Sequence, residues 1–204
     1  MDIDIIIDNL KSMMLDRGDN IDEFEEHEVD IEREKFYNDS NIIEFHTSKT
    51  TIIFAITKKL RRNILEEIKT AIKGDIASFI EKYNNKTNVV IILNDDTISS
   101  PVVHQLNTFD KMLQKQNGSM QYFHLKNVLF NPTKHSLVPK HTKLSTEEVV
   151  LIMEKYLIKG KTQFPYILHG DAIARWMGLK QGDVVKIDRY NTNSGLSHYF
   201  RVCV

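Results

Sequence analysis

The sequence predicts a two-domain protein of α+β class, with an N-terminal mixed α/β domain followed by a small α+β domain. The chain has 204 residues, 41% of them apolar, which is enough for one large or two small domains with buried cores. Helical and β-branched stretches alternate up to about Leu125, and the pattern changes around Asn127. The predicted domains are therefore 1–126 and 127–204.

Apolar residues that recur every three or four positions predict three helices in the first domain. Their expected ranges are 3–15, 62–83 and 101–115. Arg17-Gly18 and Asn117-Gly118 are the expected stops of the first and third helices, and Gly74 is a weak point within the second. The acidic stretch at 19–40 is expected to be a short helix or a loop.

β-Branched runs predict the strands of the first domain at 42–46, 51–56, 89–93 and 120–125. The first two are separated by a short polar turn and are expected to form a hairpin. The run at 89–93 is apolar without interruption, which indicates a strand covered on both faces.

In the second domain, Ser145-Thr146-Glu147-Glu148 matches a capping box. It predicts a helix to about residue 158 with Gly160 as its stop. Asp171 is expected to cap a short helix at 172–177 that Gly178 closes.

The rest of the second domain is predicted as a short strand, an irregular stretch and a terminal pair of strands. Their ranges are 128–131, 132–143, 184–190 and 197–204, with a turn at Gln181-Gly182-Asp183. The expected core residues are Val149, Ile152, Met153, Tyr156, Leu157, Ile173, Trp176, Val185, Ile187, Phe200 and Val202.

Charge is distributed unevenly along the chain, although the net charge is only −1. Residues 1–40 carry 14 acidic and 4 basic side chains, whereas residues 126–204 carry 12 basic and 6 acidic ones. The near-zero total argues against a free-standing nucleic-acid binder, which usually carries a strongly basic field. Such a bipolar chain is compatible with partners of both signs, and equally with a solvated acidic stretch.

Composition also excludes several classes of protein. The single cysteine, Cys203, excludes an internal disulfide framework and a cysteine-based zinc site. No apolar run is long enough to span a membrane, and the N-terminus lacks the features of a secretory signal. We therefore expect an intracellular, soluble chain without a membrane partner.

Asp95 and Asp96 follow the predicted buried strand and form the first pair of residues that suggests an enzyme. Paired carboxylates at this place could hold Mg²⁺ in a nuclease-like site. The same residues are ordinary turn and helix-capping residues, and no third or fourth ligand converges on them in the sequence. The alternative function is accordingly a metal-dependent, nuclease-like enzyme.

Histidines and the lone cysteine give weaker signals. His135 and His141 could ligate a metal, but no third ligand stands nearby, and packed or hydrogen-bonded histidines are the commoner case. His198 and Cys203 could be drawn as base and nucleophile, yet residues five apart in a strand point to opposite faces. No phosphate-loop, dinucleotide or zinc-protease motif occurs, so we expect no catalytic residues, no metal and no cofactor.

The densest basic cluster lies where a strand passes into a helix and comprises Lys58, Lys59, Arg61 and Arg62. It is compatible with contact to a phosphate backbone and with a solvated helix face.

The stretch from Val128 to Val204 resembles the assembly domain of the fifth-largest subunit shared by nuclear DNA-directed RNA polymerases, which is similar to a small single-domain chain of the archaeal enzymes. The resemblance is carried by HSLVPKH at 135–141, LSTEEV at 144–149, QFP at 163–165 and GDAIARWMGLKQGDVVKI at 170–187. More weakly, MMLDRG at 13–18 and TISSP at 97–101 resemble the N-terminal jaw domain of the eukaryotic subunits.

The resemblance implies a non-catalytic subunit of a multisubunit RNA polymerase. The C-terminal domain would dock on the largest subunit, beside a small omega-like subunit, and the jaw would lie near downstream duplex DNA. The interface residues expected are His135, Pro139, His141, Arg175 and Lys186, and those near DNA are Lys58, Lys59, Arg61 and Arg62. A solvated face remains the alternative for the two charged interface residues.

The amino-acid usage suggests an AT-rich genome, because Ile, Asn and Lys are abundant. A large DNA virus with its own polymerase is one source compatible with it. The chain is then expected in the nucleus if it is cellular, and in host cytoplasm and virion if it is viral.

Overall fold

The computed structural model describes residues 3–22, 43–74, 76–94, 98–193 and 195–204. The chain divides into two compact units, Met1–Phe130 and Asn131–Val204, which we call the N-terminal unit and the C-terminal unit. Both units combine helices with a four-stranded sheet, which confirms the predicted fold class. Within the described ranges, no helix is both long and apolar enough to cross a bilayer.

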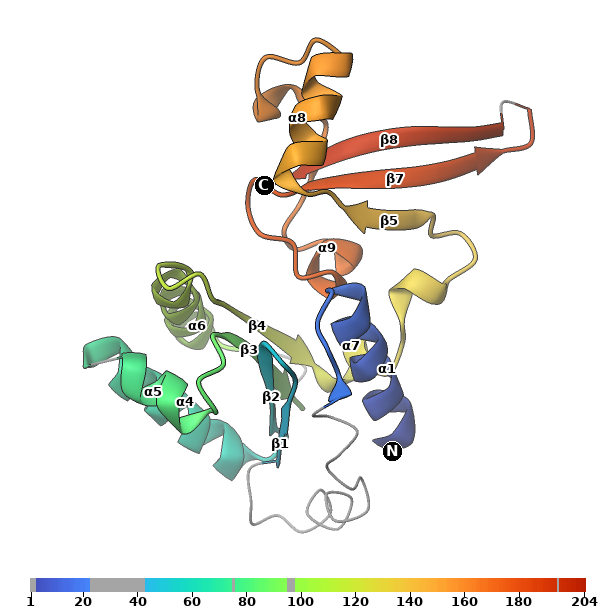
Figure 1. Ribbon diagram of the computed structural model, residues 1–204. Coiled ribbons are helices and arrows are strands. Elements are labelled where there is room, and N and C mark those ends of the chain that lie inside the picture. Colours follow the sequence, from blue (N-terminus) through green and yellow to red (C-terminus); the bar gives the residue numbers. More distant parts are fainter. Residues whose placement is uncertain (1–2, 23–42, 75, 95–97, 194) are drawn as a thin grey trace. The chain divides into compact units, whose positions relative to one another are not determined.

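The N-terminal unit is built on a sheet in the order β1-β2-β3-β4 (Figure 1). Strands β2, β3 and β4 are parallel, and β1 forms the predicted antiparallel hairpin with β2. Helices α4 and α5 connect β2 to β3, and α6 connects β3 to β4. The element bounds are α1 Ile3–Asp16, β1 Ile43–His46, β2 Thr50–Ala55, α4 Lys58–Lys73, α5 Ile76–Lys82, β3 Asn88–Leu93, α6 Ser100–Gln114, β4 Ser119–His124 and α7 Leu125–Val128.

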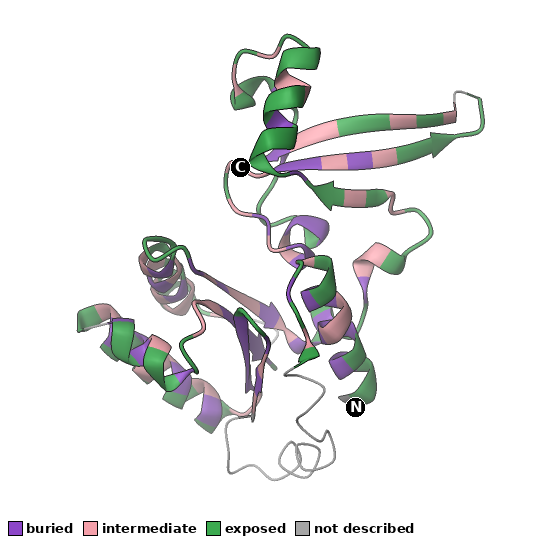
Figure 2. Cartoon of the chain, viewed as in Figure 1, coloured by how far each residue is buried: buried purple, intermediate pink, exposed green. Residues whose placement is uncertain are grey.

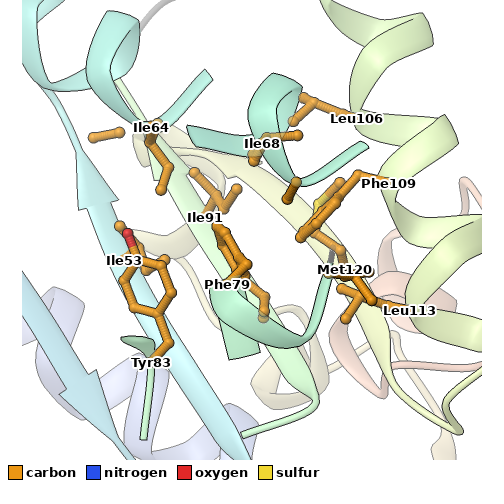
Figure 3. Close-up of a cluster of buried hydrophobic side chains, with 14 of the residues drawn as sticks. Ile53, Ile64, Ile68, Phe79, Tyr83, Ile91, Leu106, Phe109, Leu113 and Met120 are labelled. Atoms are coloured by element: carbon orange, nitrogen blue, oxygen red, sulfur yellow. The ribbon is translucent and has the colours of Figure 1, made fainter. Parts of the chain in front are cut away.

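One face of this sheet carries a large apolar core. Ile53, Ile91 and Met120 come from three neighbouring strands and pack against side chains of α4, α5 and α6 (Figure 3). The rings of Phe79 and Phe109 meet edge to face with their centroids 4.8 Å apart. Burying side chains of this size stabilises the fold by about 1.5–3 kcal/mol each before the entropy of ordering is subtracted.

Helices α1 and α7 lie on the other side of the sheet from α4, α5 and α6 (Figure 1). The Asn9 amide of α1 donates to the Val128 carbonyl of α7 at 2.9 Å, and the Arg17 guanidinium donates to Gln121 of β4 at 2.7 Å. Residues 89–93 are each at most 1% exposed, which confirms a strand covered on both faces.

The helix predicted at 62–83 is wrong in its start and in its continuity. It begins at Lys58, where the Thr57 hydroxyl accepts from the Leu60 N–H at 3.2 Å and so caps the helix. It ends at Lys73, and α5 begins beyond the predicted weak point Gly74. The start of α4 was not predicted because Lys58, Lys59, Arg61 and Arg62 are charged and contribute nothing to the apolar periodicity that identifies a helix.

The strand predicted at 128–131 is also wrong. Helix α7 ends at Val128, residues 129–131 form no strand, and Leu125 and Val128, three positions apart, are both buried. This helix spans the predicted domain boundary at 126/127, so residues up to Phe130 belong to the first compact unit. Most of the acidic stretch predicted at 19–40 lies outside the described residues.

The C-terminal unit has a sheet in the order β5-β7-β8-β6, dominated by the long antiparallel hairpin of β7 and β8. The hairpin confirms the strands predicted at 184–190 and 197–204. The element bounds are η1 Pro132–Lys134, β5 Lys140–Lys143, α8 Thr146–Lys155, η2 Lys161–Gln163, β6 Tyr166–Ile167, α9 Ala172–Trp176, β7 Val184–Asn191 and β8 Gly195–Cys203. Strands β5 and β6 were not predicted.

Local capping in this unit follows the sequence closely. Ser145 and Glu148 form the reciprocal capping box, with hydrogen bonds of 3.2 and 2.8 Å. The Asp171 carboxylate accepts from the N–H groups of Ile173 and Ala174 and caps α9. Both predicted helix starts are confirmed.

The predicted end of α8 is wrong. The helix ends at Lys155, and Leu157 takes the left-handed conformation with φ of 54°. The Ile158 N–H then donates to the Met153 carbonyl at 2.7 Å, which closes the helix before Gly160. As a result Leu157 is 87% exposed and Tyr156 is 51% exposed, so neither belongs to the core in which we expected them.

Candidate functional site

The basic cluster of the N-terminal unit occupies the first turn of α4. Lys58, Lys59 and Arg62 are exposed and Arg61 is half-buried, while Leu60 between them is buried and anchors the turn. The structure therefore places the four residues expected near DNA on one solvent-facing turn.

This cluster is unfavourable for the helix that carries it. The first turn of α4 contains no acidic residue. The N-terminus of a helix bears partial positive charge, and cations there lower helix stability. Like charges three or four positions apart add further repulsion. Helix stability therefore does not account for the cluster, whereas contact with a polyanion would.

The segment before and within β5 carries three of the residues expected at the interface. His135 is exposed, and its Nδ1 accepts from the Leu137 N–H at 3.2 Å. His141 is half-buried on β5, with Nδ1 2.7 Å from the carbonyl oxygen of Pro139. Burial lowers the pKa of His141, against the opposing effects of the Pro139 carbonyl and of Asp171, so the neutral imidazole predominates at neutral pH.

Lys186 lies on β7 in a small polar network. Its Nζ is 3.3 Å from Asp188 Oδ1, and His198 Nδ1 is 2.7 Å from the same oxygen. Desolvation raises the pKa of Asp188, but the hydrogen bonds from His198 and Lys186 outweigh it and hold the pKa below its usual value. Lys186 is thus already paired on its own sheet.

The five expected interface residues do not form one cluster. His141 pairs with Ile187 across the sheet, so it lies on the face opposite to that of Lys186. Arg175 is half-buried on α9. A single contact patch containing all five is therefore incompatible with the geometry.

The candidate catalytic pairs find little support. Asp95 and Asp96 lie outside the described residues. Cys203 is buried, and burial raises the pKa of its thiol, while His198 is bonded to Asp188 on the other face of β8. In the part of the chain that the structure describes, no group of three or more His, Cys, Asp or Glu side chains could hold a metal ion.

Two features were missed by sequence reasoning, and the first is Asp19. Its buried carboxylate accepts from the hydroxyls of Thr47, Ser48 and Thr50 at 2.6–2.7 Å and from the Lys49 N–H at 3.1 Å. It ties the end of α1 to the β1–β2 turn. The hydroxyl-rich turn was visible in the sequence, but its distant carboxylate partner was not.

The second missed feature is the exposed apolar surface of the C-terminal unit. Of the fifteen large apolar residues exposed among those described, eleven belong to it. They are Leu137, Val150, Leu151, Tyr156, Leu157, Tyr166, Leu168, Tyr190, Leu196, Tyr199 and Val204. The signal was available in α8, where five consecutive apolar residues, 149–153, exceed what one buried helix face needs.

Comparison with known proteins points to one family. Residues 130–203 match the family described as RNA polymerase Rpb5, C-terminal domain. The chain is 30% identical over 158 residues to DNA-directed RNA polymerase V subunit 5A of Arabidopsis thaliana, covering 78% of this chain and 63% of that protein. It is 33% identical over 130 residues to the subunit rpabc1 of DNA-directed RNA polymerases I, II and III of Dictyostelium discoideum, covering 61% and 64% respectively. The matched regions thus span a little under two thirds of each relative.

Proposed function

Because residues 130–203 match the Rpb5 C-terminal domain family, we propose that this chain is a non-catalytic subunit of a multisubunit DNA-directed RNA polymerase. The observation that carries the proposal is the agreement between two boundaries. The family match covers 130–203, and the compact C-terminal unit covers Asn131–Val204. A whole folded unit is therefore shared with the family, rather than a short motif within it.

Similarity to the relatives supports extending the proposal to the whole chain. The 158 residues aligned with the plant protein are more than the C-terminal unit contains, so the similarity reaches into the N-terminal unit. The matched family and both relatives belong to RNA polymerases, and none of the three is a nuclease by name. In this proposal, nucleotidyl transfer and its Mg²⁺ belong to the two largest polymerase chains.

The C-terminal unit, in this proposal, attaches the chain to the largest polymerase subunit, beside a small omega-like subunit. Its exposed apolar side chains support this role, because large exposed apolar surfaces mark protein contacts. The candidate contacts include His135 and Pro139, which precede β5. Lys186 on β7 is a separate candidate contact. Arg175 and His141 contribute only where their half-buried side chains reach the surface.

The N-terminal unit, in this proposal, lies near downstream duplex DNA as the jaw. The basic turn of α4 supports this, since its cations oppose the helix dipole and are explained by a phosphate partner. The contact is electrostatic and weak. A cellular polymerase would place the chain in the nucleus, and a polymerase of a large DNA virus would place it in host cytoplasm and virion.

The primary test is co-purification of a tagged chain at its natural expression level, followed by identification of the large chains that accompany it. We expect the two largest RNA polymerase chains encoded by the same genome. Recovery of the tagged chain without any polymerase chain would contradict the proposal.

The DNA contact is tested with Lys58→Glu/Lys59→Glu in the assembled polymerase, with Lys111→Glu/Lys115→Glu on exposed positions of the N-terminal unit as the control. Elongation complexes of the first variant should dissociate faster at low salt, and the salt dependence should weaken by about one unit of log–log slope for each phosphate that the variant no longer neutralises. An equal change at all salt concentrations would show that the contact is not electrostatic.

A further inference from the structure

Strand β8 of the C-terminal unit has an open outer edge. On one side it pairs with β7 from Gly195 to Cys203. On the other side only its last two residues pair, with Tyr166 and Ile167 of β6. Figure 1 shows the β7–β8 hairpin running on beyond β5 and α8 toward its tip. Most of β8 therefore has a strand neighbour on one side only.

The hydrogen bonds define which residues face this edge. Val202 donates its N–H outward, to the Pro165 carbonyl at 2.9 Å, whereas Cys203 donates inward, to Asp183 at 2.8 Å. Because backbone groups alternate along a strand, Leu196, His198 and Phe200 also face outward. Their N–H and C=O groups have no backbone partner within the described residues.

The two edges of this sheet differ in their protection. The β5 edge is only four residues long and carries Lys140 and Lys143, which are features that discourage further strand pairing. The β8 edge carries no lysine: Leu196 is 60% exposed, Phe200 packs against Tyr156 with ring centroids 5.9 Å apart, and His198 between them is bonded to Asp188. Open strand edges of this kind accept an extended peptide as an additional strand.

We infer that the outer edge of β8, from Leu196 to Phe200, binds an extended segment of another polymerase chain as an added β-strand. The inference rests on the proposed function and names the chemistry of the partner segment. The Pro165 carbonyl already accepts from Val202, so the added strand ends before β6 begins.

The side chains beside this edge define the partner sequence. Leu196 and Phe200 project to one face of the sheet and favour apolar residues at alternate positions of the added strand. Tyr199 and Arg201 project to the other face, where the Arg189 guanidinium lies 4.8 Å from the Tyr199 ring centroid. Acidic residues are favoured on that face. The partner segment therefore alternates apolar and acidic residues.

Hydrogen exchange tests the added strand directly, using the full chain alone and the same chain within the purified polymerase. The outward amides of Leu196, His198 and Phe200 should exchange at least about tenfold more slowly in the polymerase. The outward amide of Lys143 on β5 serves as the control and should show no comparable change. Unchanged exchange at all three β8 positions would overturn the inference.

A pair of variants separates the backbone from the side chain. Both His198→Pro and His198→Ala remove the hydrogen bond to Asp188, but only the proline removes the outward N–H, and it leaves the β7 ladder intact. In competition with the wild-type chain for assembly, His198→Pro should be incorporated about tenfold less and His198→Ala within about twofold of wild type.

The outcomes distinguish this inference from the proposed function. If the wild-type chain does not assemble with the polymerase, the proposed function and this inference both fail. If it assembles while the two His198 variants are incorporated equally and the exchange is unchanged, the inference alone fails. Should the proline variant not fold, as judged by Trp176 fluorescence, the exchange experiment decides by itself.

Discussion

The two units of this chain differ in how completely they bury their apolar side chains. The N-terminal unit surrounds β3 on both faces and, among the described residues, exposes four large apolar side chains. The C-terminal unit is smaller yet exposes eleven, and Figure 2 shows exposed residues along α8 and toward the tip of the β7–β8 hairpin. Exposed apolar side chains in this number favour a protein contact, which is why we propose that the C-terminal unit is the one that binds the polymerase.

Unfolding of the two units can be followed with two different spectroscopic probes. The sequence contains one tryptophan, Trp176, which is buried in the C-terminal unit. Its fluorescence reports unfolding of that unit, while far-UV circular dichroism reports both.

Asp19→Ala should strongly destabilise the N-terminal unit. The substitution leaves four hydrogen-bond donors of the β1–β2 turn without their carboxylate, at a cost of about 2–4 kcal/mol. Urea unfolding followed by circular dichroism should show the loss, while the Trp176 transition stays in place. Asp8→Ala, at an exposed position of α1, should change stability by less than about 0.5 kcal/mol. An equal shift of both probes would show that the units unfold together.

The contribution of Asp19 should depend on pH. Burial raises the pKa of this carboxyl, but the hydrogen bonds from Ser48, Thr47, Thr50 and the Lys49 backbone outweigh it and hold the pKa below the ordinary value of 3.8. The stabilisation is therefore present above that value and is lost as the pH falls below it. The stability difference between wild type and Asp19→Asn should shrink below about pH 4. A difference that stays constant down to pH 2 would refute this account of Asp19.

Ser145→Ala should destabilise only the C-terminal unit. The serine caps α8 reciprocally with Glu148, and loss of such a cap costs about 1 kcal/mol. The Trp176 transition should move to lower urea. Thr146→Ala, one position later and exposed, should leave it within about 0.5 kcal/mol. Similar effects from both substitutions would argue against the cap.

Leu157→Gly should stabilise the C-terminal unit by about 0.5–1 kcal/mol, because glycine adopts the left-handed conformation without strain and Leu157 buries little surface. The same substitution at Leu151, exposed within α8, should cost about 1 kcal/mol. If Leu157 contacts the polymerase, the more stable variant should nevertheless assemble less well. If Leu157→Gly stabilises the unit and assembles as well as the wild type, Leu157 does not contact the polymerase.

Regular periodicity explains which parts of the fold were predictable. The helix at 3–16, the buried strand at 88–93 and the capped start of α8 each carry a local signal that tertiary packing only reinforces. Strand β5 carries no such signal, since its sequence Lys-His-Thr-Lys has no apolar face and the strand exists only by pairing with β7. Likewise, the end of α8 depends on a leucine in a conformation that sequence rules assign to glycine.

The candidate site was less predictable than the fold. The basic turn of α4 was identified because its residues are adjacent in the sequence. The expected interface residues all lie in one motif-rich region of the sequence, but alternation along strands places His141 and Lys186 on opposite faces of the sheet. The open edge of β8 could not be identified, because it depends on how few residues β6 contributes.

We propose that the C-terminal unit attaches this chain to the polymerase and that the N-terminal unit does not. The direct measurement is retention of the fragments 1–130 and 131–204, each first checked for folding by circular dichroism, on the largest RNA polymerase subunit of the same genome. We expect the 131–204 fragment to be retained about as well as the full chain and the 1–130 fragment to be lost. Retention of a folded 1–130 fragment together with loss of a folded 131–204 fragment would contradict the claim.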